Sequence, residues 1–136
     1  MSSSIACIDY RDGKVFIAKR QNVGDMGGRW EFPGGKIDEG EDFQRAIKRE
    51  MSEEFGVQVE VGRHITRSEF FHKEKKCFLD VFEVTFLEDG LKRKFNLTEH
   101  TDYRWEKIEN IPNLSFVDSD FAVYDDVLKW CKNEKV

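Results

Sequence analysis

Three glutamates of the sequence have a spacing that suits metal binding. Glu50, Glu53 and Glu54 stand at positions i, i+3 and i+4, which share one face of an α-helix. Like charges at that spacing destabilise a helix unless a cation neutralises them. Mg²⁺, for which Mn²⁺ could substitute, binds such oxygen ligands and is commonly shared with substrate phosphates. The triplet therefore predicts a magnesium site; the alternative is a solvated acidic helix face.

The charge balance limits which substrates the chain can bind. The sequence has 22 Lys and Arg against 27 Asp and Glu, a net charge of -5. A protein that binds a nucleic acid polymer by releasing its counterions carries an excess of positive charge, so this net charge has the wrong sign. A small polyanion would need a bound metal or a few well-placed cations. The charge balance therefore argues against a nucleic acid polymer as a partner.

The cysteines and the apolar runs predict a cellular location. Cys7, Cys77 and Cys131 are widely spaced among apolar residues, as is typical of reduced core cysteines. No apolar run approaches the length of a membrane-spanning helix, and the first ten residues lack the basic and apolar regions of a leader. These features predict a cytoplasmic protein without a membrane partner.

The glutamates belong to a segment with helical periodicity. From residue 43 to residue 55, apolar side chains recur at spacings of three and four, the period of an amphipathic helix. Asp42 can cap the first turn, and Gly56 can adopt the left-handed conformation that ends a helix. The triplet would thus lie on the second half of a well-delimited helix.

The residues before this helix predict short strands. Residues 5–10 and 15–20 are rich in strand-forming residues and flank Asp12-Gly13, a pair typical of a tight hairpin turn. Residues 21–29 contain three glycines and predict a loop. Residues 30–32 form a further short strand that ends at Pro33.

The residues after the helix complete an α/β pattern within one domain, residues 1–136. Two strands, at residues 70–71 and 77–86, would be joined by a charged turn at 72–76 and followed by a turn at 88–90. Residues 103–105 predict a late strand, and Ile111-Pro112 starts a connection. Residues 121–131 have the period of an amphipathic terminal helix. Strands mixed with two helices indicate layers rather than a bundle or a barrel.

Residues 35–57 resemble the signature of the Nudix hydrolase family. That signature is Gly, five residues, Glu, seven residues, Arg-Glu, an aliphatic residue, any residue, Glu-Glu, any residue, Gly and an aliphatic residue. The matching positions are Gly35, Glu41, Arg49, Glu50, Met51, Glu53, Glu54, Gly56 and Val57. Residues 30–36 also resemble the MutT-like subgroup, and residues 99–105 resemble its late strand. Such a long, gapped pattern is far more specific than a short glycine motif.

The resemblance implies a fold and a catalytic centre. The fold would be an α/β/α sandwich with a mixed central sheet, a catalytic loop-helix-loop and a C-terminal helix. The Gly34 carbonyl, Glu50, Glu53, Glu54 and a later residue, Glu99, are similar to the family's metal ligands. Glu50 or Glu53 would accept the proton of an attacking water, with Glu99 as a further candidate base. The alternative for Glu99 is a surface turn residue.

Several other positions take their expected roles from the same resemblance. Arg49 would pair with the glutamates and assist catalysis, whereas Glu41 and Gly56 would be structural. The expected substrate-binding residues are Arg20, Phe32, Gly35, Lys36, Asp118 and Asp120. Asp120 resembles the residue that reads the base just before the terminal helix, with helix capping as its alternative. Ordinary surface cations are the alternative for Arg20 and Lys36, core packing is that for Phe32, and His100 is expected to be structural or exposed.

The resulting hypothesis is a Mg²⁺-dependent, MutT-like nucleoside triphosphate pyrophosphohydrolase. Its substrate would be 8-oxo-dGTP or (d)CTP, cut to a monophosphate and pyrophosphate by a monomer or homodimer. The chain lacks the proline and tyrosine that follow the signature in subfamilies acting on ADP-ribose or diadenosine polyphosphates. The alternatives are a non-catalytic Nudix sensor that binds a nucleotide, or an interaction module.

Overall fold

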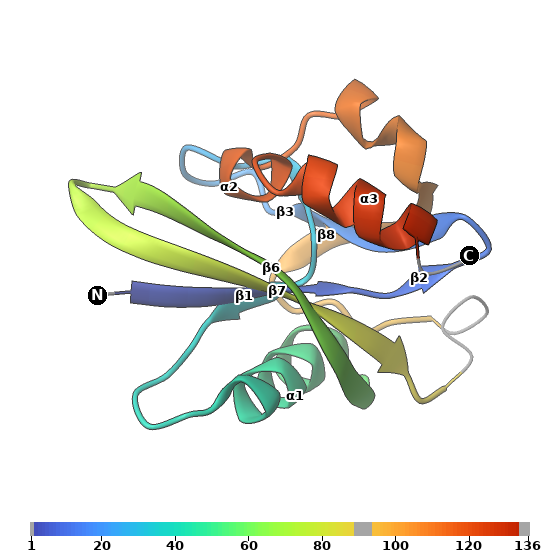
Figure 1. Cartoon of the computed structure of the whole chain (residues 1–136), viewed down its shortest axis with the longest axis horizontal. Helices are drawn as coiled ribbons and strands as arrows, with labels where there is room; N and C mark the ends of the chain where they lie inside the picture. The colour runs from blue at the N-terminus through green and yellow to red at the C-terminus, as the bar shows by residue number, and fades with distance from the viewer. Residues whose placement is uncertain (1, 89–93, 134–136) are drawn as a thin grey trace.

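The computed structural model describes residues 2–88 and 94–133 (Figure 1). Its first sheet has the order β5 (Gly34–Lys36), β1 (Ser2–Ile8), β7 (Lys75–Phe86) and β6 (Val59–His72). β1 runs parallel to β7, whereas β5 with β1 and β6 with β7 are antiparallel. The sheet is therefore mixed, and its largest hairpin, β6–β7, has the strands predicted around residues 70 and 77–86.

The second sheet is centred on β3 (Lys14–Arg20). β8 (His100–Lys107) pairs with β3 over nearly its whole length. β2 (Tyr10–Arg11) and β4 (Trp30–Glu31) pair with opposite ends of β3. Both the strand around Trp30 and the late strand are thus present, and residues 21–29 form the predicted loop.

The predicted opening hairpin is correct only at its turn. β2 and β3 form a short hairpin around Asp12 and Gly13, but β1 leaves it and joins the first sheet between β5 and β7. The reason is Asp9, a buried carboxylate that accepts hydrogen bonds from Phe86 N at 2.9 Å and from the Arg11 guanidinium at 2.9 and 3.1 Å. These bonds fix the point at which the chain passes from one sheet to the other.

Helix α1 (Phe43–Phe55) has the predicted limits. The Asp42 side chain accepts a hydrogen bond from Arg45 N at 2.8 Å, and Gly56 ends the helix with φ 65° and ψ 30°. One face of the helix is buried against the sheet through Ala46, Ile47, Met51 and Phe55. The same face also buries Glu54.

The predicted terminal helix is divided in the structure. A 3₁₀ helix, η1 (Ile108–Asn113), precedes α2 (Asp118–Phe121) and α3 (Tyr124–Asn133). The Asp120 carboxylate accepts a hydrogen bond from Phe32 N at 3.0 Å, which anchors α2 to the end of β4, and the chain turns before α3 starts. Phe121, expected on the buried face, is consequently 45% exposed.

The layers agree with an α/β/α sandwich, with α1 on one side of the strands and α2 and α3 on the other (Figure 1). Alternate residues of the strands contribute to two cores: Ile17 and Val81 pack on the α3 side, and Phe16 and Phe82 on the α1 side.

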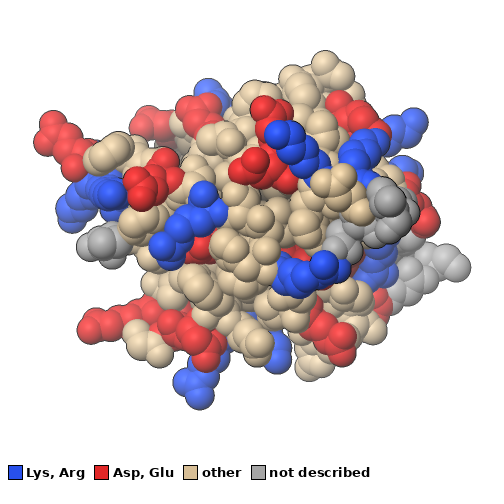
Figure 2. All heavy atoms as spheres, viewed as in Figure 1, with Lys and Arg blue, Asp and Glu red and all other residues tan. Residues whose placement is uncertain are grey.

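Charged side chains of both signs are interspersed on the face shown in Figure 2. No helix in the described ranges is long and apolar enough to span a membrane. The predicted turn at 88–90 extends into residues outside those ranges.

Candidate active site

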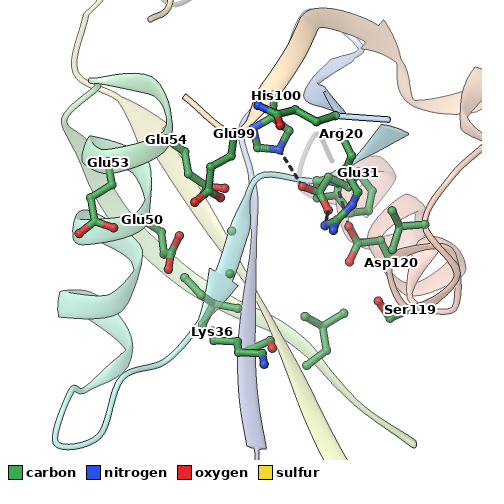
Figure 3. A pocket seen from close by; sticks show the side chains of 18 of the residues that line it. Arg20, Glu31, Lys36, Glu50, Glu53, Glu54, Glu99, His100, Ser119 and Asp120 are labelled. Atoms are coloured by element: carbon green, nitrogen blue, oxygen red, sulfur yellow. Dashed lines mark hydrogen bonds and ion pairs between the residues drawn. The ribbon is translucent and has the colours of Figure 1, made fainter. Parts of the chain in front are cut away.

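A cleft of about 630 Å³ opens between α1, α2 and the ends of both sheets (Figure 3). Most of the residues singled out in the sequence line it, from elements far apart in the chain. They are Arg20, Phe32, Gly34, Gly35, Lys36, Glu50, Glu53, Glu54, Glu99 and Asp120. The fold thus brings the glutamates of α1 and the Asp120 region to opposite walls of one cavity.

Two glycines of β5 allow the backbone to lie close to the first carboxylate. A Cβ atom on Gly34, at φ 154°, would come within 2.0 Å of the Ile5 carbonyl oxygen. A Cβ atom on Gly35 would lie 2.7 Å from the carboxylate of Glu50. Glu50 therefore packs directly over the Gly35 backbone, and a side chain at this position would displace the Glu50 carboxylate.

Glu50 and Glu54 project from α1 into the cleft, whereas the Glu53 side chain is 61% exposed (Figure 3). Burial, followed by the charge of Glu50, raises the pKa of Glu54 to about 10. Burial also raises the pKa of Glu50, which is hydrogen-bonded to Glu54. Two carboxylates held this close favour a shared proton or a cation between them.

The site fits a divalent cation in its donor chemistry. Glu54 Oε2 is buried and has no hydrogen-bond partner, and unpartnered buried oxygens are costly unless a ligand uses them. The four glutamates that line this side of the cavity, Glu50, Glu53, Glu54 and Glu99, offer carboxylate oxygens, which suit Mg²⁺. Among residues 2–88 and 94–133, no three acidic, His or Cys side chains already surround an ion position. Glu50 and Glu54 could hold the ion once Glu53 turned towards them, and Glu99 lies close enough for its charge to raise the pKa of Glu54 further.

Arg49 ties the loop before α1 to the glutamates. Its guanidinium donates to both oxygens of Glu41 at 2.8 and 2.9 Å, to Glu50 at 2.9 Å and to Glu53 at 3.3 Å. It also donates to the Lys36 carbonyl at 3.0 Å. The hydrogen bonds from Arg49 lower the pKa of Glu41 to about 2. Neither Arg49 nor Glu41 lines the cleft. Arg49 therefore orients Glu50 and Glu53 through hydrogen bonds made outside the cavity.

The far wall of the cleft is formed around Asp120. This side chain is buried, and its burial, with the charge of Glu31, raises its pKa to about 8. Phe70 and Leu79 of the β6–β7 hairpin, together with Val117, add apolar surface to this part of the cavity. The Phe32 ring also contributes to the wall, but it is 2% exposed and packs edge-to-face on Phe116 at 5.0 Å.

Asp118 is not brought into the cleft. Its side chain is 77% exposed and forms an ion pair with Arg29 at 2.9 Å. The residue two positions later, Asp120, is the one whose carboxylate points inward, because two positions along a helix differ in direction by about 200°. Gly56 also lies outside the cavity and ends α1.

A family model for the NUDIX domain matches residues 2–130 of the chain. The chain belongs to the Nudix family. This confirms the family and the fold expected from residues 35–57, and makes the chain a hydrolase that acts on phosphoric anhydride bonds. The MutT-like character is likewise confirmed, since 8-oxo-dGTP diphosphatases are among the relatives and a solved structure of a MutT protein is 27% identical over 95% of this chain.

Three comparisons illustrate the range within the Nudix family. The CTP pyrophosphohydrolase of Escherichia coli (strain K12) is 40% identical over 65 residues, which is 48% of each chain, so the match spans about half its length. The 8-oxo-dGTP diphosphatase of Buchnera aphidicola subsp. Schizaphis graminum (strain Sg) is 27% identical over 88% of this chain and 87% of its own. The solution structure of the E. coli ORF135 protein has a TM-score of 0.82, with 26% identity over 95% of this chain and 89% of that one.

Several polar residues of the Nudix cleft were not predicted as site residues, and two of them, Glu31 and His100, are bonded to each other. Glu31 and His100 line the cavity, and the His100 side chain is 2% exposed; the option that it is exposed was therefore wrong. Their positions follow from pairing between strands that are distant in sequence. The one local signal is a glutamate between the apolar residues Trp30 and Phe32 in a short buried strand.

Proposed function

We propose that this Nudix hydrolase cuts a nucleoside triphosphate into a nucleoside monophosphate and pyrophosphate. The observation that carries the proposal is the placement of paired carboxylates and the buried Asp120 on opposite walls of a single cavity. The carboxylate wall suits the phosphates and their cation, and the Asp120 wall, with its apolar side chains, suits a base. The named activities of the E. coli and Buchnera relatives support the same class of substrate.

The residues of the carboxylate wall would have separate roles in hydrolysis. Glu50, Glu53, Glu54 and the Gly34 carbonyl would hold Mg²⁺ or Mn²⁺, with Glu99 as an additional ligand. When bound, the cation lowers the pKa of a water and neutralises charge on the phosphate oxygens. Glu50 or Glu53 accepts the proton of the attacking water. Arg20 and Lys36 contact the phosphate chain along the cleft, where Gly35 leaves the backbone accessible.

The Asp120 wall suits a base that presents a hydrogen-bond acceptor beside a donor. With its pKa near 8, the Asp120 carboxyl is mostly protonated at pH 7 and can both donate and accept a hydrogen bond. 8-oxoguanine presents such a pair, because it carries an N–H at N7 beside the O6 acceptor, where ordinary guanine has two acceptors. Cytosine presents one as well, its N3 acceptor beside the N4 amine. We infer that 8-oxo-dGTP is preferred, because the Buchnera relative, which matches over 87% of its own length, is an 8-oxo-dGTP diphosphatase. (d)CTP is the second candidate, because the 40% identical E. coli relative is a CTP pyrophosphohydrolase.

A sensor that binds nucleotide without cutting it is the less favoured function. Such a protein gains little from three adjacent carboxylates, two of them forced together in the cleft, since their mutual repulsion only destabilises the helix. A cytoplasmic location and a monomeric or dimeric state remain predictions from the sequence.

The test is a panel of nucleotides, including 8-oxo-dGTP and dCTP, incubated with Mg²⁺ while released pyrophosphate is measured. Glu53→Gln and Glu54→Gln should each reduce the rate by 100-fold or more, because an amide holds Mg²⁺ poorly. Glu60→Gln, a matched change at an exposed strand position, should leave the rate unchanged. Equal pyrophosphate release by wild type and both cleft variants would disprove the proposed site.

A further inference from the structure

One wall of the cleft contains three polar side chains linked from strand to strand. Glu31 of β4 accepts a hydrogen bond from Arg20 Nη1 of β3 at 3.2 Å and bonds with its other oxygen to His100 Nε2 of β8 at 2.7 Å (Figure 3). The exposed fraction of the side chain falls along the series, from 43% for Arg20 to 14% for Glu31 and 2% for His100. The link therefore runs from the open cleft into the core.

The strand register explains how these three side chains meet. Glu31 is the cross-strand partner of Ala18, whose small side chain leaves room for His100 and Glu31 to meet across β3. The pairing of β3 with β8 shifts by one position after Lys19, so Arg20 lies opposite His100. Such irregularities commonly redirect a side chain at a functional site.

His100 is also fixed to the helix that carries the glutamates. Its ring stacks on Phe55 of α1 with centroids 5.2 Å apart and an interplanar angle of 19°, and Phe55 directly follows Glu54. Because a carboxylate only accepts hydrogen bonds, Nε2 carries the proton in the bond to Glu31. Nδ1 is buried without a hydrogen-bond partner in the described part of the chain. Glu31 is thus the group that orients the imidazole ring.

An ion pair with a half-exposed arginine is weak on its own, because two flexible side chains must be ordered in solvent. The bond from His100 removes this freedom on the Glu31 side. The carboxylate then presents one oxygen in a fixed position to Arg20, and the position is set relative to α1.

We propose that His100 is a positioning residue: acting through Glu31, it holds the Arg20 guanidinium at a set distance from the glutamates of α1. A phosphate chain would then be bound between a prearranged arginine and the carboxylate-held cation. The proposal deepens the proposed function, since it relies on Arg20 as a phosphate contact.

The test measures binding of inorganic tripolyphosphate by isothermal titration calorimetry, with Ca²⁺ in place of Mg²⁺. His100→Leu removes the hydrogen bond and should weaken binding about fivefold, whereas His100→Gln, which keeps an N–H donor, should recover most of the loss. His64→Leu is the matched control. His64 Nε2 also bonds to a carboxylate, Asp80, at 2.8 Å, but His64 lies on β6 outside the cleft.

A double-mutant cycle separates positioning from a general structural effect. In an Arg20→Met background, His100→Leu should cause no further loss of tripolyphosphate binding, because the group that it positions is absent. Glu31→Gln, at a partly exposed site, should behave as His100→Leu does and keeps the test valid if His100→Leu fails to fold. Circular dichroism verifies the fold of each variant.

Additive losses in the cycle, an unchanged affinity in folded His100→Leu and Glu31→Gln, or no binding to wild type would each overturn the proposal. The proposed function is tested separately by nucleotide hydrolysis. Coupled binding without hydrolysis of any nucleotide would leave the positioning role standing and refute the enzymatic one. Nucleotide hydrolysis by wild type together with additive binding losses in the cycle would support the enzymatic function and refute the positioning role of His100.

Discussion

At the scale of single residues, the cleft depends on acids placed where water cannot fully solvate them. Glu54 and Asp120 lie on opposite walls, and burial raises the pKa of both, to about 10 and about 8. The causes differ beyond burial, since Glu54 is raised further by Glu50 and Asp120 by Glu31. Glu54 would release its proton when a cation binds, whereas Asp120 remains a neutral hydrogen-bonding group near pH 7.

Asp120 should make the protein less stable as the pH rises. Its pKa is raised from 3.8 to about 8 on folding, so between these values the native state holds a proton that the unfolded state has lost. Its contribution is complete below about pH 4 and is lost as the pH approaches 8, with a slope on the order of 1 kcal/mol per pH unit. In urea unfolding without divalent ions, Asp120→Asn should gain stability relative to wild type from pH 5 to pH 8.

The comparison with Asp120→Asn isolates one titration, because Glu54 is present in both proteins. The asparagine oxygen can still accept the hydrogen bond from Phe32 N, so the backbone contact is preserved. Asp118→Asn, a change at a 77% exposed side chain, should follow the wild-type curve at every pH. If the free energies of unfolding of wild type and Asp120→Asn changed in parallel with pH, folding would not raise the pKa of Asp120.

At the scale of elements, helix α1 must be fixed in position for the glutamates to face the cleft. Asp42→Ala removes the hydrogen bond to Arg45 N and should lower the free energy of unfolding by about 1 kcal/mol. For a domain of this size that corresponds to a decrease of roughly 3 to 5 °C in Tm. Thermal unfolding followed by circular dichroism measures it.

Asp42→Asn is the control, because asparagine caps a helix about as well as aspartate. Asp42 does not line the cleft, so kcat measured well below the Tm should be unchanged in both variants. A loss of stability as large in Asp42→Asn as in Asp42→Ala would assign the effect to charge rather than to capping.

The elements also show what the sequence could and could not predict. The limits of α1 followed from local signals, the Asp42 cap, the apolar period and Gly56, and the structure agrees with them. The position of β1 could not be predicted, because each of its residues pairs with a residue of β7 that lies 75 positions later in the chain. The split between α2 and α3 depends on the bond from Phe32 N to Asp120, a contact between distant segments that leaves no mark on periodicity.

The site was predictable to the extent that it depends on spacing along one helix. Glu50, Glu53 and Glu54 could be recognised because their geometry is set by the helix itself. Glu31 and His100 escaped recognition because their bond crosses β3 between strands that are separated by about seventy residues. Asp118 and Asp120 could not be told apart before the direction of α2 was known.

At the scale of the whole molecule, the carboxylate pair links metal binding to the stability of the fold. Glu50 and Glu54 lie on α1, and Glu50 packs against Gly35 of β5, so a cation held by them and by the Gly34 carbonyl of β5 would join the helix to the first sheet. A ligand that binds only the native state stabilises it by about 2.7 kcal/mol at a concentration of 100 times its Kd. Saturating Mg²⁺ should therefore raise the Tm of wild type by several degrees, as measured by differential scanning fluorimetry.

Screening of surface charge has to be separated from binding at the cleft, because the chain has a net charge of -5 and salt alone weakens its self-repulsion. NaCl at matched ionic strength gives that baseline, and Mn²⁺ should act as Mg²⁺ does. Glu54→Gln should lose most of the shift above the baseline, whereas Glu60→Gln should keep all of it. If Glu54→Gln and wild type gain the same Tm from Mg²⁺, the ion that stabilises the molecule lies outside the cleft, and the α1 carboxylates do not bind it.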